Sequence, residues 1–136
     1  MKNGKYIEFE TEYWFKKNRL HREDGPAIIW ENGDLYWYKD GKLHREDGPA
    51  VILKNSAQFW YYEGNLYRED GPAASDGSRD QTWVKNGMTH REDGPAVIGA
   101  NLEEAWWLNG HQYFFEDWFK LTTVEGRLYF LFSGEE

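Results

Sequence analysis

Short hydrophobic runs separated by polar turns follow one another along most of this chain. In one example, residues 27–30 form an apolar run, residues 31–34 read Glu-Asn-Gly-Asp, and residues 35–38 form a second run. Two runs of this length joined by an Asn-Gly pair are typical of a β-hairpin. The pattern therefore predicts a strand, a tight turn and a return strand.

This pattern recurs with a fixed period of 23 residues. The segment HREDGPA begins at His21, His44 and His90, and YREDGPA begins at Tyr67. A tryptophan lies seven residues before each segment, and a fifth keeps the same step; these are Trp14, Trp37, Trp60, Trp83 and Trp106. A period of this length indicates a tandem-repeat architecture. We expect a single repeat domain over 1–136. It comprises an N-terminal strand over 1–13, four repeats (14–36, 37–59, 60–82 and 83–105), and a divergent half-repeat with a C-terminal cap over 106–136.

A second turn in each unit carries a glycine at a constant position. The glycines are Gly41, Gly64, Gly87 and Gly110, and Asn18 occupies the position in the first copy. Both residue types enter the left-handed region of backbone space, so a tight turn is predicted here.

The return strand carries aromatic residues on both faces. Period two sends Trp37 to one face and Tyr36 and Tyr38 to the other. Two strands per unit, about 4.8 Å apart, advance the sheet by about 9.6 Å per repeat. The five tryptophans are therefore expected to form a continuous structural row in the core, and the opposite face is expected to be wet, covered or offered to a partner.

The C-terminal section departs from the repeat. Phe114, Trp118 and Leu121 have the spacing of an amphipathic helix laid over the last hairpin, and residues 127–132 read as a final strand. The section is interpreted as protection of the sheet edge, with a homodimer interface through these aromatics as the alternative.

Composition agrees with a β fold. The chain has eight Trp, nine Tyr and eight Phe, and such wide side chains stabilise neighbouring strands on a pleated surface. The predicted fold is mostly β: an elongated twisted antiparallel sheet of tandem 23-residue hairpins, capped by a short C-terminal helix and strand.

Charge and cysteine content restrict the partners. A net charge of −8 opposes binding to nucleic acid and to anionic membranes. The absence of cysteine excludes disulfides and thiolate metal sites and favours a reducing compartment. No stretch approaches the roughly 18 apolar residues of a membrane span. A cytoplasmic location is expected.

The repeated polar rows are the candidate binding residues. They are His21, Arg22, Glu23, His44, Arg45, Glu46, Tyr67, Arg68, Glu69, His90, Arg91 and Glu92. Rows about 9.6 Å apart cannot converge on one zinc ion, whose ligands lie about 2 Å from it. A catalytic carboxylate pair needs two different environments, whereas these positions recur in equivalent ones. No metal, cofactor or enzymatic activity is expected.

A structural role for the same rows is also predicted. The arginine of one unit is expected to reach carboxylates of the next unit, and Asp24 is expected to hold the Gly25-Pro26 turn by bonds to the backbone.

The units resemble MORN-type repeats, and most closely a divergent MORN-like group with W-x3-G-x2-HREDGPA units found in bacteriophages and large DNA viruses. The resemblance covers about residues 14–112. It implies stacked hairpins in an elongated twisted sheet. The Arg-Glu-Asp between His and Gly-Pro departs from the ordinary MORN pattern, and the acidic balance does not support lipid binding.

Two functions follow as hypotheses. The first is a non-enzymatic protein-interaction module, in which a phage or viral protein in the host cytoplasm binds and inhibits a host protein such as an antiviral defence factor. The second is a small-ligand binder, or sponge, that holds a nucleotide-like signal with its Arg and aromatic rows. Acidic neighbours compete for each arginine, which ranks the sponge second.

Overall fold

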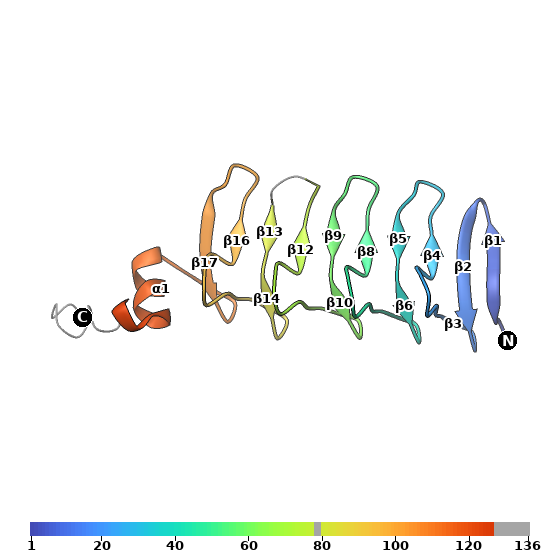
Figure 1. Cartoon of the computed structure of the whole chain (residues 1–136), viewed down its shortest axis with the longest axis horizontal. Coiled ribbons are helices and arrows are strands. Elements are labelled where there is room, and N and C mark those ends of the chain that lie inside the picture. Colours follow the sequence, from blue (N-terminus) through green and yellow to red (C-terminus); the bar gives the residue numbers. More distant parts are fainter. Residues whose placement is uncertain (78–79, 127–136) are drawn as a thin grey trace.

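The protein, described here from a computed structural model over residues 1–77 and 80–126, is one layer of hairpins lying side by side (Figure 1). Twelve strands of this part form one sheet. In spatial order its path runs through β1 (Gly4–Glu8), β2 (Thr11–Lys16), β4 (Ile28–Ile29), β5 (Leu35–Tyr36), β8 (Val51–Ile52), β9 (Gln58–Phe59), β12 (Ala74–Ser75), β13 (Gln81–Thr82), β16 (Val97–Ile98), β17 (Glu104–Leu108) and β18 (His111–Tyr113). The twelfth strand, β3 (Arg19–Leu20), pairs with β2. The mostly β fold class is confirmed.

Register repeats with the sequence period. Ile28 of β4 is opposite Tyr36 of β5, which in turn is opposite Val51 of β8 in the next repeat. Each repeat therefore adds two antiparallel strands, and equivalent positions recur along the same face of the sheet.

Each central return strand is interrupted at its tryptophan and continues as a second, shorter hairpin. These hairpins are β6 (Tyr38–Lys39) with β7 (Lys42–Leu43), β10 (Tyr61–Tyr62) with β11 (Asn65–Leu66), and β14 (Val84–Lys85) with β15 (Met88–Thr89). At the first of their turns Gly41 has φ of 81°, and Asn18 has φ of 65° in the equivalent turn after β2. The predicted left-handed turns are thus confirmed.

The N-terminal segment differs from the single strand predicted over 1–13. It forms a hairpin, because β1 and β2 pair across Phe9 and Glu10, whose φ values are 49° and 61°. This turn contains neither Gly nor Asn, the residues that usually signal a two-residue hairpin turn.

The buried centre of the sheet consists of alanines and a few larger aliphatic residues, among them Ile28 and Val51. The alanines of the four GPA segments, Ala27, Ala50, Ala73 and Ala96, are fully buried. Trp14 donates its backbone N–H to the carbonyl of Ala27 at 2.8 Å, and later repeats have the same bond. The predicted tryptophan core is only partly correct, because the five repeat tryptophans are half-buried. A single layer has no second layer to cover such large rings.

The C-terminal end of the sheet is covered by α1 (Phe115–Thr122), which confirms the predicted helix. Trp118 is buried, its ring centroid lies 4.5 Å from that of Trp106, and its Nε1–H donates to the carbonyl of Arg91 at 3.0 Å. The predicted apolar stripe is only partly correct, since Phe114 and Leu121 are exposed. The strand predicted over 127–132 lies outside the described residues.

Candidate functional site

Each arginine of the HRED segments is held between an indole ring and a glycine. The Cζ of Arg45 lies 4.0 Å from the centroid of the Trp37 ring, and the other three copies have separations of 3.8–4.0 Å. On its other side, a Cβ added at Gly48 would lie 2.8 Å from the same Cζ. A side chain at the glycine position would therefore displace the guanidinium, which in its observed position gains a cation–π contact.

The edge of each guanidinium is bonded within its own segment. Arg22 donates from Nε to Asp24 at 2.9 Å and from Nη1 to the carbonyl of Pro26 at 3.1 Å. The other three copies repeat both bonds. The predicted pairing with carboxylates of the next unit is wrong, because each guanidinium pairs with the aspartate two residues later in its own segment. The side-chain hydrogen bond to the backbone of the Gly25-Pro26 turn is made by Arg22, whereas the prediction assigned it to Asp24.

The same contact acts on the ionisation of Asp24. The hydrogen bond from Arg22 and the positive charge of that side chain lower the pKa of the Asp24 carboxyl below its ordinary value of 3.8. At neutral pH Asp24 is ionised, so the Arg22–Asp24 pair carries no net charge.

The histidines are buried joints between repeats. His21, His44 and His90 are 7–8% exposed. Their Nδ1 atoms accept the backbone N–H of the residue 19 positions later, at 3.0, 2.9 and 2.9 Å. A neutral ring that accepts at Nδ1 carries its hydrogen on Nε2. In the first and fourth copies Nε2 lies 3.0 and 3.1 Å from a glutamate of the same segment.

Tyr67 replaces histidine in the third copy and keeps only one of these contacts. Its hydroxyl donates to Glu69 at 2.7 Å. This bond raises the pKa of the Tyr67 hydroxyl, with smaller contributions from burial and the charge of Glu69. A phenol ring has no counterpart of Nδ1, so the side-chain acceptor for the next repeat is lost.

Backbone bonds flank the first histidine joint on both sides. Gly41 donates its N–H to the carbonyl of Leu20 at 2.8 Å, and Arg22 donates its N–H to the carbonyl of Tyr38 at 3.2 Å. Three consecutive residues of one repeat are thereby fastened to the next.

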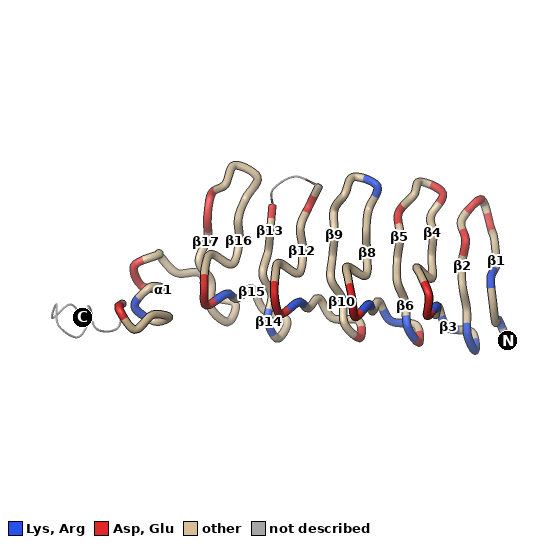
Figure 2. The backbone as a smooth tube through the Cα atoms, viewed as in Figure 1, with Lys and Arg blue, Asp and Glu red and all other residues tan. Residues whose placement is uncertain are grey.

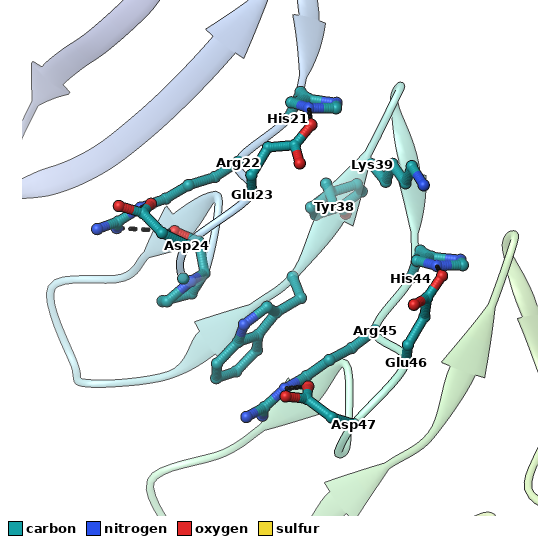
Figure 3. A pocket seen from close by; sticks show the side chains of 13 residues that line it. His21, Arg22, Glu23, Asp24, Tyr38, Lys39, His44, Arg45, Glu46 and Asp47 are labelled. Atoms are coloured by element: carbon teal, nitrogen blue, oxygen red, sulfur yellow. Dashed lines mark hydrogen bonds and ion pairs between the residues drawn. The ribbon is translucent and has the colours of Figure 1, made fainter.

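Cavities lie between HRED segments of adjacent repeats. One of about 650 Å³ separates residues 21–24 from residues 44–47, and another of about 540 Å³ lies between the third and fourth segments. Figure 3 shows the repeated arrangement of His, Arg, Glu and Asp around the first cavity. The two cavities share no lining residue, and we call them, with the four segments that line them, the HRED groove.

The predicted binding residues have different exposures in this groove. The histidines are buried and the arginines are covered, whereas the side chains of Glu23, Glu46 and Glu92 are 77%, 70% and 65% exposed. The adjacent aspartates were not predicted as binding residues, yet they are 80–89% exposed. Figure 2 shows these acidic positions at equivalent places in successive repeats. In the sequence, each of these aspartates directly follows a glutamate that was predicted to bind, and this adjacency could have identified them.

Comparison with protein families, curated proteins and solved structures finds no match for this chain. Within residues 1–77 and 80–126, no group of three or more His, Asp or Glu side chains is arranged to hold a metal ion. The same part of the chain contains no helix long and apolar enough to cross a membrane.

Proposed function

We propose that this chain is a non-enzymatic protein-interaction module whose HRED groove binds an extended basic segment of a partner protein. The exposed Glu carboxylates of the groove support this proposal, because the aspartate of each segment is already paired with its arginine. The arginine charges between them are covered by indole rings and paired with the aspartates, and Lys39 and Lys85 also line the two cavities. The glutamate of each segment therefore supplies the negative charge that the groove offers to a partner.

The spacing of the groove favours a partner in polyproline II conformation. Two strands per repeat advance by about 9.6 Å, and three residues of polyproline II advance by about 9.3 Å. A Lys or Arg at every third position of such a segment would stay in register with successive carboxylates.

The alternative, a sponge for a nucleotide-like anion, has less support. Both faces of Arg45 are covered, and its Nε and Nη1 already donate to Asp47 and to the carbonyl of Pro49. A phosphate in the groove would also meet the exposed carboxylates of neighbouring segments.

The biological part of the proposal is that the partner is a host defence factor, inhibited by this chain as a phage or viral protein. The resemblance of the HREDGPA units supports this setting. A factor held through the groove would be released by the groove variant described next.

Peptide binding tests the groove. We expect a labelled peptide with lysine at every third position between prolines to bind more tightly than a peptide of equal composition with lysine at every second position. Replacing Glu23, Glu46, Glu69 and Glu92 by Gln should weaken binding about tenfold, because four exposed ion pairs are lost. Fluorescence anisotropy at fixed ionic strength measures both effects.

A matched variant controls for net charge. Glu10, Glu103, Glu104 and Glu116 are exposed outside both the groove and the other cavities, and their replacement by Gln changes the charge equally. Equal loss of affinity in both variants, or equal binding of both peptides, would contradict a groove-specific interaction.

A further inference from the structure

A second hollow lies away from the HRED groove, at the tips of the first two hairpins. Its volume is about 700 Å³. Figure 1 shows the β1–β2 turn beside the turn between β4 and β5, where this hollow lies. Its aromatic and acidic lining residues are Glu8, Phe9, Tyr13, Trp30, Glu31 and Asp34. We call it the tip hollow.

The aromatic rings of the tip hollow form a fixed corner. The centroids of Tyr13 and Trp30 are 6.3 Å apart and their planes are inclined by 72°. Tyr36 lies against Trp30, with a separation of 5.9 Å and an angle of 71°, and supports the indole. Trp30 remains 37% exposed. The face of an aromatic ring is electron-rich and attracts a cation.

The charge of the tip hollow is negative throughout. Three carboxylates line it and no Lys or Arg does. Asp34 is held in place, since it accepts from the backbone N–H of Lys54 at 2.7 Å and from the amide of Asn32 at 3.1 Å. Glu8 and Glu31 form no ion pair within the described part of the chain.

The third aromatic residue occupies a strained position. Phe9 has φ of 49° and is 86% exposed. A bulky side chain is unfavourable in this region, and turns of this kind prefer Asn or Gly. Phe9 therefore has an unfavourable backbone conformation, and its exposed ring gains no free energy from burial. An aromatic residue under both costs at the edge of a hollow is typical of a binding residue.

We infer that the tip hollow binds an organic cation with a methylated ammonium group. The methyl groups would contact Tyr13, Trp30 and Phe9, and the nearby carboxylates would balance the charge. This is the chemistry by which aromatic residues recognise quaternary ammonium ligands. The group could belong to a small molecule or to a methylated lysine side chain, and the site is independent of the HRED groove.

Choline and its uncharged analogue 3,3-dimethylbutan-1-ol test the inference on the full chain. The two ligands share a shape and differ in charge. Choline should shift the NMR signal of the Trp30 indole N–H in a saturable way, at least threefold more tightly than the neutral analogue, because a cation–π contact needs the charge. Equal binding of both ligands, or binding of neither, overturns the inference. Peptides with trimethyl-lysine or unmodified lysine distinguish the two sources, and tighter binding of the trimethylated peptide than of choline assigns a protein partner.

Variants test the residues individually. Isothermal titration calorimetry measures choline binding to the variants, because Trp30→Leu removes the indole whose NMR signal reports binding. Trp30→Leu and Glu31→Gln should each weaken choline binding at least threefold, whereas Glu10→Gln, in the same region but outside the hollow, should leave it unchanged. Phe9→Asn should weaken binding and yet raise the melting temperature by about 3 °C, because Asn suits the left-handed turn. If Phe9→Asn stabilises the protein and leaves choline binding unchanged, Phe9 is not part of the site. If all four variants bind choline with equal affinity, the tip hollow is not the binding site.

Discussion

The arginine of each HREDGPA segment accounts for several of its neighbours at once. Arg45 lies on Trp37, donates to Asp47, donates to the Pro49 carbonyl and leaves no room for a Cβ at residue 48. Four residues that look like independent elements of a motif are therefore one packing unit.

A double-mutant cycle tests this unit. Gly48→Ala should destabilise the protein by about 1–3 kcal/mol, because the new methyl group displaces the guanidinium. In an Arg45→Ala background the same change should be neutral or stabilising by up to about 1 kcal/mol, because alanine restricts the unfolded chain. Urea unfolding measures both, and equal effects in the two backgrounds would show that the glycine is kept for another reason.

Between hairpins, the histidine side chain accepts a hydrogen bond from a backbone N–H, as a backbone carbonyl would in a sheet. His44 bonds to the N–H of Glu63 in the following repeat, and the other two histidines make the same connection. Tyr67 leaves the joint between the third and fourth repeats without this bond. At the three histidine joints, adjacent hairpins are thus connected by both main-chain and side-chain hydrogen bonds.

Exchanging the two residue types tests the joint. Tyr67→His should stabilise the protein by about 1 kcal/mol, since it adds an acceptor for the next repeat, and His44→Tyr should destabilise it by a similar amount. His111→Tyr, at an exposed position, serves as the control and should change little. Thermal unfolding measures the three variants. Loss of stability in Tyr67→His would contradict the assigned role of Nδ1.

The molecule as a whole is a row in which each repeat pairs with its neighbours. The strand order increases steadily from β1 to β18, so the main sheet contains no long-range crossover within the described residues. Such a row has approximately additive stability. Its first two hairpins form the tip hollow, the HRED segments of the four repeats line the HRED groove, and α1 covers the opposite end (Figure 1).

Removing one whole period tests this additivity. Deletion of residues 37–59 brings His21 to the N–H of Glu63 in place of Asp40, so the chain should fold with a lower melting temperature and a urea m-value smaller by roughly one sixth. Deletion of residues 37–48 breaks the period and should abolish cooperative unfolding. Similar behaviour of the two deletions would contradict a periodic row.

Short-range sequence patterns were sufficient to predict the repeat. The 23-residue period, two strands per unit and the turns at Gly41 and Asn18 follow from alternation and from the backbone freedom of Gly and Asn. The turn at Phe9 and Glu10 was missed because its residues oppose the same rules. Polarity also marked the HRED rows as a common edge.

Tertiary structure decided what each side chain in those rows does. The Trp14 ring stacks on the Arg22 guanidinium across a hairpin, and His21 accepts a hydrogen bond from the N–H of Asp40 in the next repeat. Such contacts depend on the bend of the chain and on the offset between hairpins, which periodicity does not encode. The tip hollow likewise exists only because Tyr13 and Trp30, from different hairpins, meet in space.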